Sequence, residues 1–286
     1  NKTVIRRFHD DCFVQGLSKP RIIKLIESMR TLAGMLRVDL EKAQHDDLKD
    51  LVSQIETHTW TSWTKVTYKT ILKKFYKWLR GNNEDYPPEV KFIKTTLKQK
   101  DVQLLSPKDL ITEEEVNRAI NKADHPRSKA FLAVLAESGC RVGEIGNLTL
   151  KSVSFDRHGG ILNVTGKTGS RRVRIVQSVK HLANWLDCHP FKDNPDAAVW
   201  INVGAVHPRE PSKYAALAKV IRDAFKAAGI RKRCNPHIFR HSRASILANH
   251  LTEFQMNHYF GWTQGSDMPS TYIHMTGKDL EGAILK

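Results

Sequence analysis

The chain has 286 residues, of which 40% are hydrophobic and 27% are charged. This composition is typical of a globular protein with one large or two ordinary domains, and it excludes a wholly disordered chain. Lys and Arg total 46 against 30 Asp and Glu, which gives a net charge of +16 at pH 7. Such an excess favours a polyanionic partner, with nucleic acid ahead of an anionic membrane surface.

The sequence contains no signal of secretion or membrane insertion. No run approaches the roughly 18 apolar residues that a membrane-spanning helix needs, and no signal peptide is visible. The cysteines are scattered without a CxxC pair, which favours a reducing compartment over a disulfide framework or a zinc site. They are Cys12, Cys140, Cys188 and Cys234.

Periodicity predicts three helices in the first third of the chain. Apolar side chains recur at helical spacing from residue 17 to residue 36, and again in the two stretches that follow. Gly81 suits the position after the last of these helices, where a tract of turn-forming residues begins. The predicted helices cover residues 17–36, 47–57 and 62–80.

A polar stretch over residues 98–108 ends in Ser106-Pro107 and is interpreted as an interdomain linker. We therefore expect a helical N-terminal domain over residues 1–100, a linker over 101–108 and a second domain over 109–286. Positive charge is shared between the two parts, because residues 1–105 carry +7 and residues 106–286 carry +9.

The second domain is predicted to be mostly helical around one small sheet. A capping-box pattern at Thr112 begins a helix through Ala123, and a buried helix over 127–138 is closed by Gly139. The apolar period then changes to that of strands, which predicts an antiparallel meander. The predicted strands are 152–155, 160–165 and 172–176, and the later helices are 181–187, 212–228, 237–249 and 253–260. The predicted fold class is therefore mainly α with a small antiparallel β-sheet (α+β).

Four lysines follow one another at i,i+4 on the third predicted helix, opposite an apolar face. Like charges at this spacing repel each other by a few tenths of a kcal/mol, about the size of a surface ion pair. A solvated face is the ordinary explanation for such a row. In a chain with this net charge we favour contact with a phosphate backbone. The lysines are Lys65, Lys69, Lys73 and Lys77.

The tract Gly166-Lys167-Thr168 has the ending of a nucleotide-binding P-loop. Ile161 stands where that motif needs its first glycine, and the residues before the tract form a strand, so a P-loop is excluded. What remains is a hairpin turn that presents Lys167, either as a solvated lysine or as a contact to DNA. The arginines beside it are further candidates for DNA contacts, namely Arg171, Arg172 and Arg174.

Two segments place arginine where it suits a phosphate. His237 and Arg240 share one face at the start of a helix, where Arg supplies a planar fork and His a titratable donor. His237 and His241 have the spacing of a two-histidine metal site, but no glutamate lies between them and no acidic third ligand is obvious. Arg141 follows a buried helix and precedes Glu144, and such a pair is often structural.

These segments, in this order, resemble the motifs of the tyrosine recombinase (phage integrase) family, most closely its Xer-like members. Residues 137–148 look like the first arginine box, Lys167 is similar to the β-hairpin lysine, and residues 235–242 look like the His-x-x-Arg box. Phe260-Gly261-Trp262 and residues 270–274 resemble the terminal box with the nucleophilic tyrosine. The resemblance covers residues 108–286, and the N-terminal helices match the core-binding (SAM-like) domain only in kind.

Two features depart from the family pattern. Trp262 stands where most members have His, and the interval from Trp262 to Tyr272 is one residue longer than is common. A lone tyrosine would ordinarily be a core residue, but its family partners make Tyr272 the expected nucleophile. Tyr259 is a poorer competitor, since it precedes the Gly-Trp pair and lies in an apolar helix.

The resemblance implies a site-specific recombinase that closes around DNA as a C-shaped clamp. Arg141 and Arg240 would bind the scissile phosphate, with a further donor from His237 or from the Trp262 indole. Tyr272 would attack phosphorus to leave a 3′-phosphotyrosine, its proton lost with help from clustered cations or taken by His237. Lys167 would protonate the 5′ oxygen. No cofactor and no metal is expected.

Other functions stay open at this point. The same residues serve type IB topoisomerases, and a DNA-binding accessory protein without catalysis is a further alternative.

The apolar tail Leu280–Lys286 is expected to dock on a neighbouring protomer of a tetramer on paired sites, with packing on its own domain as the alternative. The expected partner is double-stranded DNA, in a cytoplasmic, nucleoid-associated location. The sequence does not indicate the target site, the accessory proteins, or whether the chain is an integrase, a dimer resolvase or a transposon recombinase.

Overall fold

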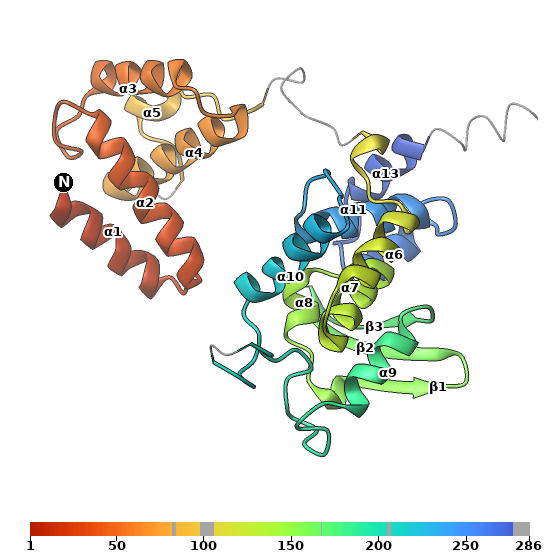
Figure 1. The fold of residues 1–286 in the computed structure, drawn as a ribbon. Coiled ribbons are helices and arrows are strands. Elements are labelled where there is room, and N and C mark those ends of the chain that lie inside the picture. Colours follow the sequence, from red (N-terminus) through yellow and green to blue (C-terminus); the bar gives the residue numbers. More distant parts are fainter. Residues whose placement is uncertain (82–83, 98–105, 167, 205–206, 277–286) are drawn as a thin grey trace, which may run out of the picture. The chain divides into compact units, whose positions relative to one another are not determined.

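The structure is a computed structural model that describes residues 1–81, 84–97, 106–166, 168–204 and 207–276 (Figure 1). Contacts divide the chain into two compact units, residues 1–104 and residues 105–286. Each unit has a hydrophobic core of its own. In the described part of the chain, no helix combines the length and the apolar character needed to cross a membrane.

The first unit is a bundle of helices around a core that contains Phe8 and Phe75, whose rings meet edge to face at 5.2 Å. The buried hydroxyl of Tyr76 donates to the Leu40 carbonyl at 2.9 Å and so ties the connection after α2 to α4. The three predicted helices are confirmed, and an unpredicted helix, α1, precedes them. The helices are α1 (Lys2–Val14), α2 (Lys19–Met35), α3 (His45–Thr57), α4 (Ser62–Leu79) and the short α5 (Pro88–Lys91).

The row of four lysines on α4 is less exposed than expected. Lys69 is only 8% exposed and forms an ion pair with Glu56 at 2.6 Å. Lys65 donates to the backbone carbonyl of Glu56, also at 2.6 Å. Lys69, which we expected to contact a phosphate backbone, is instead buried, and its ammonium fastens α4 to the end of α3.

The other two lysines contact the segment that follows α4. Lys73 donates to the Ile93 carbonyl at 3.1 Å and lies 4.2 Å from the centroid of the Tyr86 ring. Lys77 donates to the Glu84 carbonyl at 3.2 Å and also lies over Tyr86. Both side chains are half-buried. The row of lysines thus holds neighbouring backbone in place in addition to any contact with an anion.

The second unit confirms the predicted α+β class, with helices around a three-stranded antiparallel meander of order β1-β2-β3. The strands are β1 (Val153–Asp156), β2 (Gly159–Gly166) and β3 (Gly169–Ile175). The helices are α6 (Glu113–Lys122), α7 (Pro126–Ser138), α8 (Val142–Gly146), α9 (Val179–Asp187), α10 (Tyr214–Ala227), α11 (Pro236–Leu247), α12 (Glu253–Phe260) and α13 (Met268–Thr276), with 3₁₀ turns at Pro107–Asp109 and Leu150–Ser152.

Buried α7 is the element against which the site is built. Phe131 and its neighbours are fully buried, and α9 and β3 pack on the helix. Glu137, near its end, accepts hydrogen bonds from the backbone N–H groups of Val176, Gln177 and Ser178 and from the Ser178 hydroxyl, at 2.5–3.0 Å. This carboxylate therefore fixes the end of β3 and the start of α9 relative to α7.

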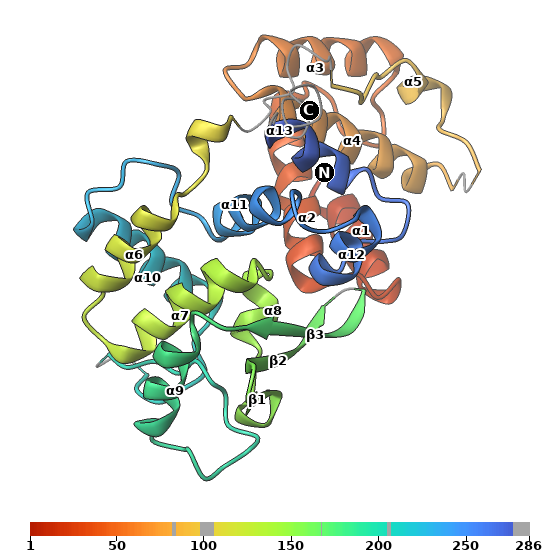
Figure 2. The same ribbon diagram turned by 90° about the vertical axis from the view of Figure 1, so that its right-hand side faces the viewer.

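Gly139 ends α7 in the left-handed conformation, with φ of 58°. A Cβ there would lie 2.8 Å from Cβ of Arg243 on α11 and 3.0 Å from the Phe260 ring on α12. Only glycine therefore allows the residues after α7 to approach both helices this closely. Figure 2 shows the β2–β3 hairpin reaching toward α12, and β3 contacts that helix.

Two helices of this unit are absent from the predicted elements. α8 has five residues, too few to produce a periodic apolar pattern. α13 carries Tyr272, which packs in a small apolar cluster with Ala244, Met256 and Phe260. The tyrosine at the end of the recognisable motifs is therefore part of a helix that lies against α11 and α12.

Candidate active site

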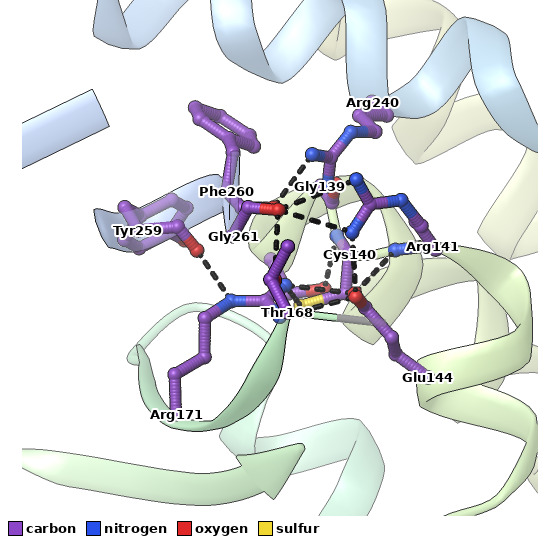
Figure 3. A network of polar contacts seen from close by, with 11 residues as sticks. Gly139, Cys140, Arg141, Glu144, Thr168, Arg171, Arg240, Tyr259, Phe260 and Gly261 are labelled. Atoms are coloured by element: carbon purple, nitrogen blue, oxygen red, sulfur yellow. Dashed lines mark hydrogen bonds and ion pairs between the residues drawn. The ribbon is translucent and has the colours of Figure 1, made fainter. Parts of the chain in front are cut away.

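Segments that are more than 100 residues apart in the sequence meet at the C-terminal end of α12 (Figure 3). The turn between α7 and α8 contributes Arg141 and Glu144, and α11 contributes Arg240. The β2–β3 hairpin contributes Thr168 and Arg171. The guanidinium groups of three arginines and one carboxylate thus lie within a single hydrogen-bonded network.

Glu144 is the carboxylate of this network, and its side chain is only 2% exposed. Arg171 binds it with two hydrogen bonds, of 3.1 and 2.7 Å. Arg141 donates to it through both its guanidinium and its backbone N–H, each at 2.9 Å. Burial alone would raise the pKa of Glu144, but the hydrogen bonds from Arg171 and Arg141 lower it to about 2. The carboxylate is therefore ionised at neutral pH.

The carbonyl oxygens at the C-terminal end of α12 accept further hydrogen bonds from the arginines. Tyr259 accepts from Nε of Arg171 at 2.7 Å, and Phe260 accepts from Arg240 at 2.6 Å. Gly261 accepts from both Nη atoms of Arg141, at 3.4 and 3.3 Å. Carbonyls at a helix C-terminus lack intrahelical partners and carry partial negative charge, so this helix end attracts cations.

Arg240 is the most constrained of the three arginines. It is 5% exposed, donates to the Gly139 carbonyl at 3.2 Å, and lies over the rings of Phe260 and Trp262 at 5.0 and 5.3 Å. Burial first, and then the nearby charge of Arg141, lowers its pKa to about 10. The guanidinium remains charged at neutral pH, in a position where an anion would be stabilised strongly.

Arg171 was expected to contact DNA, and the structure corrects this. Its side chain is 5% exposed and is bound to Glu144, to the Tyr259 carbonyl and, at 3.7 Å, to Sγ of Cys140. It therefore positions Glu144 and the end of α12. Arg172 and Arg174 point to the exposed side of β3, and Arg174 pairs with Asp156 at 2.6 Å.

The hairpin turn approaches this network closely. A Cβ at Gly166 would lie 2.4 Å from Oε1 of Glu144, and Thr168 donates to the Gly261 carbonyl at 3.1 Å. Gly166 pairs with Gly169 across the hairpin. Lys167, the expected hairpin lysine, lies outside the described residues, but the residues on both sides of it contact the network.

Tyr272 lies in α13 with 1% of its surface exposed. Its hydroxyl oxygen is 2.6 Å from Nδ1 of His241, and its ring stacks on the Trp262 ring at 5.7 Å with planes 5° apart. Burial raises the pKa of Tyr272 to about 12, against a smaller opposite effect of Arg240. The phenol is therefore protonated at neutral pH.

Of the remaining expected residues, His237 is exposed, and Trp262 stacks between the rings of Phe260 and Tyr272. Partial desolvation of its imidazole, then the charges of Arg240 and Arg141, lower the pKa of His237. The centroids of the His237 and His241 rings are 6.4 Å apart. Among the described residues, no cluster of three or more His, Cys, Asp or Glu side chains could hold a metal ion.

Contact between His241 and Tyr272 is the main feature of the site that we did not expect from the sequence. The sequence offers only a weak signal for this contact: His241 follows Arg240 directly and lies one helical turn after His237. This spacing shows that His241 and His237 share a side of α11. It does not show which helix packs there, and in the structure that helix is α13.

A sequence model of the phage integrase family matches residues 109–278, which is more than half of the chain. The tyrosine recombinase XerD of Yersinia pestis is 25% identical over 267 residues, covering 88% of this chain and 86% of that protein. A crystal structure of a lambda integrase dimer bound to a COC′ core site has a TM-score of 0.73 at 14% identity, covering 96% of this chain and 77% of that one. A lambda integrase tetramer bound to a Holliday junction has a TM-score of 0.69 at 12% identity, covering 93% and 78%.

Replacing Glu144 tests whether its buried carboxylate holds the network together. Glu144→Gln is expected to lower the free energy of unfolding at pH 7 by about 3 kcal/mol, because Arg171 loses its buried counter-charge. The pKa of Glu144 is depressed from 4.5 to about 2 in the folded chain. Its stabilisation is therefore fully present above pH of about 4.5 and is lost as the pH falls toward about 2.

Urea unfolding followed by circular dichroism at several pH values between about 7 and 3 measures this effect. The gap between the wild type and Glu144→Gln should narrow as the pH falls below about 4.5. Asp156→Asn is the control, because that carboxylate pairs with Arg174 at the exposed edge of the sheet and its loss should matter little. A gap that stays constant over the whole pH range would contradict the assigned role of Glu144.

Proposed function

The chain belongs to the phage integrase family, and we propose that Tyr272 is the nucleophile with which it cleaves DNA. As a member of this family it is a site-specific recombinase, an enzyme that breaks and rejoins DNA strands. The observation that carries the assignment of the site is the convergence of Arg141, Arg240 and the hairpin on the end of α12. Trp262 follows that end, and its ring stacks on that of Tyr272 in α13.

The two arginines are proposed to bind the scissile phosphate. A phosphodiester has one negative charge, and its pentacoordinate transition state gathers more on the non-bridging oxygens. Arg141 is 32% exposed, and its Nη atoms make their longest hydrogen bonds to the Gly261 carbonyl, at 3.3–3.4 Å. A phosphate oxygen is a stronger acceptor than a carbonyl and can replace it. His237 and the Trp262 indole N–H are the proposed additional donors.

The covalent step follows from these positions. The Tyr272 oxygen attacks phosphorus, a 3′-phosphotyrosine forms, and the strand leaves with a free 5′ hydroxyl. Lys167 is the proposed general acid for the leaving 5′ oxygen, supported by the contacts of Thr168 and Gly166 with the network. The phosphotyrosine bond keeps the energy of the phosphodiester, so rejoining is the reverse attack by a 5′ hydroxyl and consumes no nucleotide.

Replacing Tyr272 by Phe tests the nucleophile. Tyr272→Phe is expected to abolish the covalent protein–DNA adduct on a nicked suicide substrate, because the attacking oxygen is missing, while affinity for the same DNA stays within about threefold. Denaturing gels measure the adduct, and gel shifts measure binding. Tyr259→Phe is the matched control on α12 and should still form the adduct. Persistence of the adduct in Tyr272→Phe would show that another residue is the nucleophile.

Both units are proposed to contact duplex DNA, since positive charge is divided between them. Within the first unit, the half-buried lysines differ from Lys69, which is held by Glu56. Joint replacement of Lys65, Lys73 and Lys77 by Gln is expected to lower the salt dependence of binding by up to about three units, roughly one per lost phosphate contact.

Lys69→Gln provides the contrast. It is expected to lower stability, because the Glu56 carboxylate loses its ion pair with α4, and to leave the salt dependence of DNA binding unchanged. Fluorescence titrations of labelled duplex at several salt concentrations measure both variants. If the triple variant also keeps the wild-type slope, the row of lysines does not contact DNA.

We propose that the chain assembles into a tetramer on paired sites through its tail. The lambda integrase dimer and tetramer with the same fold support oligomerisation in general. The tail, residues 280–286, lies outside the described residues, and its sequence contains Leu280, Ile284 and Leu285. Deleting it should leave binding to one half-site intact and remove cooperative binding to a full site, as measured by gel shift. Cooperative binding by the truncated chain would rule out a role of the tail between protomers.

A further inference from the structure

The hydroxyl of Tyr272 is paired with His241 rather than with His237. His241 lies on α11 and Tyr272 on α13, and the two helices pack directly on each other. The Tyr272 oxygen is 2.6 Å from Nδ1 of His241, and their ring centroids are 5.8 Å apart with planes tilted by 37°. The donors of Arg240 are directed elsewhere, to the carbonyls of Gly139 and Phe260.

The surroundings keep this imidazole neutral. Burial first, and then the charges of His237, Arg240 and Arg233, lower the pKa of His241 below its ordinary value of 6.5. A neutral imidazole has one nitrogen that can accept a proton, and the phenol beside it is still protonated because the pKa of Tyr272 is raised to about 12. In the tautomer whose ring hydrogen is on Nε2, the hydroxyl donates to Nδ1.

We propose that His241 is the general base that takes the proton of Tyr272 when this residue attacks DNA, an inference that rests on the proposed function. The O–H bond of Tyr272 breaks and its proton moves to Nδ1 of His241, while the phenol oxygen forms a bond to phosphorus. The bond between phosphorus and the 5′ oxygen breaks, and that oxygen receives a proton from the general acid proposed above. The geometry already meets the distance that such a transfer needs, about 2.6–3.2 Å between heavy atoms.

The role of His241 differs from that of His237 on the same helix. His237 is exposed and is the proposed donor to the phosphate, so its loss weakens stabilisation of the transition state whatever the acidity of the nucleophile. A base that removes the proton of the phenol becomes less important as the phenol becomes more acidic. The two histidines can therefore be distinguished by changing the acidity of residue 272.

The experiment measures single-turnover cleavage of a suicide duplex at saturating protein. His241→Leu keeps the approximate volume of the side chain and removes the acceptor, and it is expected to slow cleavage by about 10²-fold or more. His241→Asn keeps a hydrogen-bond acceptor near the position of Nδ1 but cannot carry the proton away at neutral pH, so it should position Tyr272 and still cleave slowly. Melting temperature and DNA affinity confirm that each variant is folded.

Each protein is then prepared with 3,5-difluorotyrosine at position 272, whose phenol is more acidic. The deficit of His241→Leu relative to the wild type should shrink by at least tenfold, because a more acidic phenol depends less on a base. The deficit of the control variant His237→Leu should stay the same. An equal deficit of His241→Leu with both nucleophiles would show that His241 only packs against Tyr272.

Cleavage by His241→Leu at or above the wild-type rate would also overturn the proposal. A faster rate would show that the hydrogen bond between His241 and Tyr272 restrains the nucleophile. Failure of the proposed function gives a different result, because the wild-type chain itself would then form no adduct. A wild-type adduct together with an undiminished rate in His241→Leu overturns only the role of His241.

Discussion

The buried carboxylate of Glu144 is the group on which the arrangement of the site depends. Arg141, Arg171 and Arg240 carry like charges, and gathering them away from water is costly. Glu144 offsets the charge of the first two through short hydrogen bonds, and the carbonyls at the end of α12 supply acceptors for all three. The pKa of Arg240 is lowered to about 10 because its guanidinium is buried and lies near the charge of Arg141, which is the part of this cost that is not offset.

This charge cluster also explains why particular glycines are needed. Gly166 lets the hairpin approach Glu144, since a Cβ there would lie 2.4 Å from Oε1. Gly261 has a φ of 60°, and a Cβ there would lie 2.8 Å from Nη1 of Arg171. The hairpin and the end of α12 are thus held against the same arginines, Trp262 follows immediately, and its ring stacks on that of Tyr272 in α13. The groups proposed to bind phosphate and the proposed nucleophile therefore belong to one packed unit.

Much of the fold could be predicted because helices and strands differ in apolar period. The change of period after α7 predicted the three strands, and the helices after them were confirmed within a few residues. The same reasoning could have separated the arginines of β3. Arg171 alternates with Val173 and Ile175 on the buried face, whereas Arg172 and Arg174 lie on the exposed one.

Contacts between elements could not be predicted in the same way. A helical spacing places Lys65, Lys69 and Lys73 on one side of α4 but does not show that α3 and the segment after α4 cover that side. The partner of His241 depends on the packing of α13, a helix whose short, mixed sequence has little periodicity. The resemblance to the family's motifs thus pointed to the arginines and the tyrosine, and tertiary packing decided which groups they touch.

The central claim is that Arg141 and Arg240 exchange the carbonyls at the end of α12 for a DNA phosphate, while Glu144 and Arg171 keep their places. A crystal structure of Tyr272→Phe bound to a duplex with one half-site tests this most directly. We predict hydrogen bonds from Arg141 and Arg240 to the non-bridging oxygens of a single phosphate, with the pair between Arg171 and Glu144 unchanged. Arginines still bound to Phe260 and Gly261, with the phosphate held by other residues, would contradict the account.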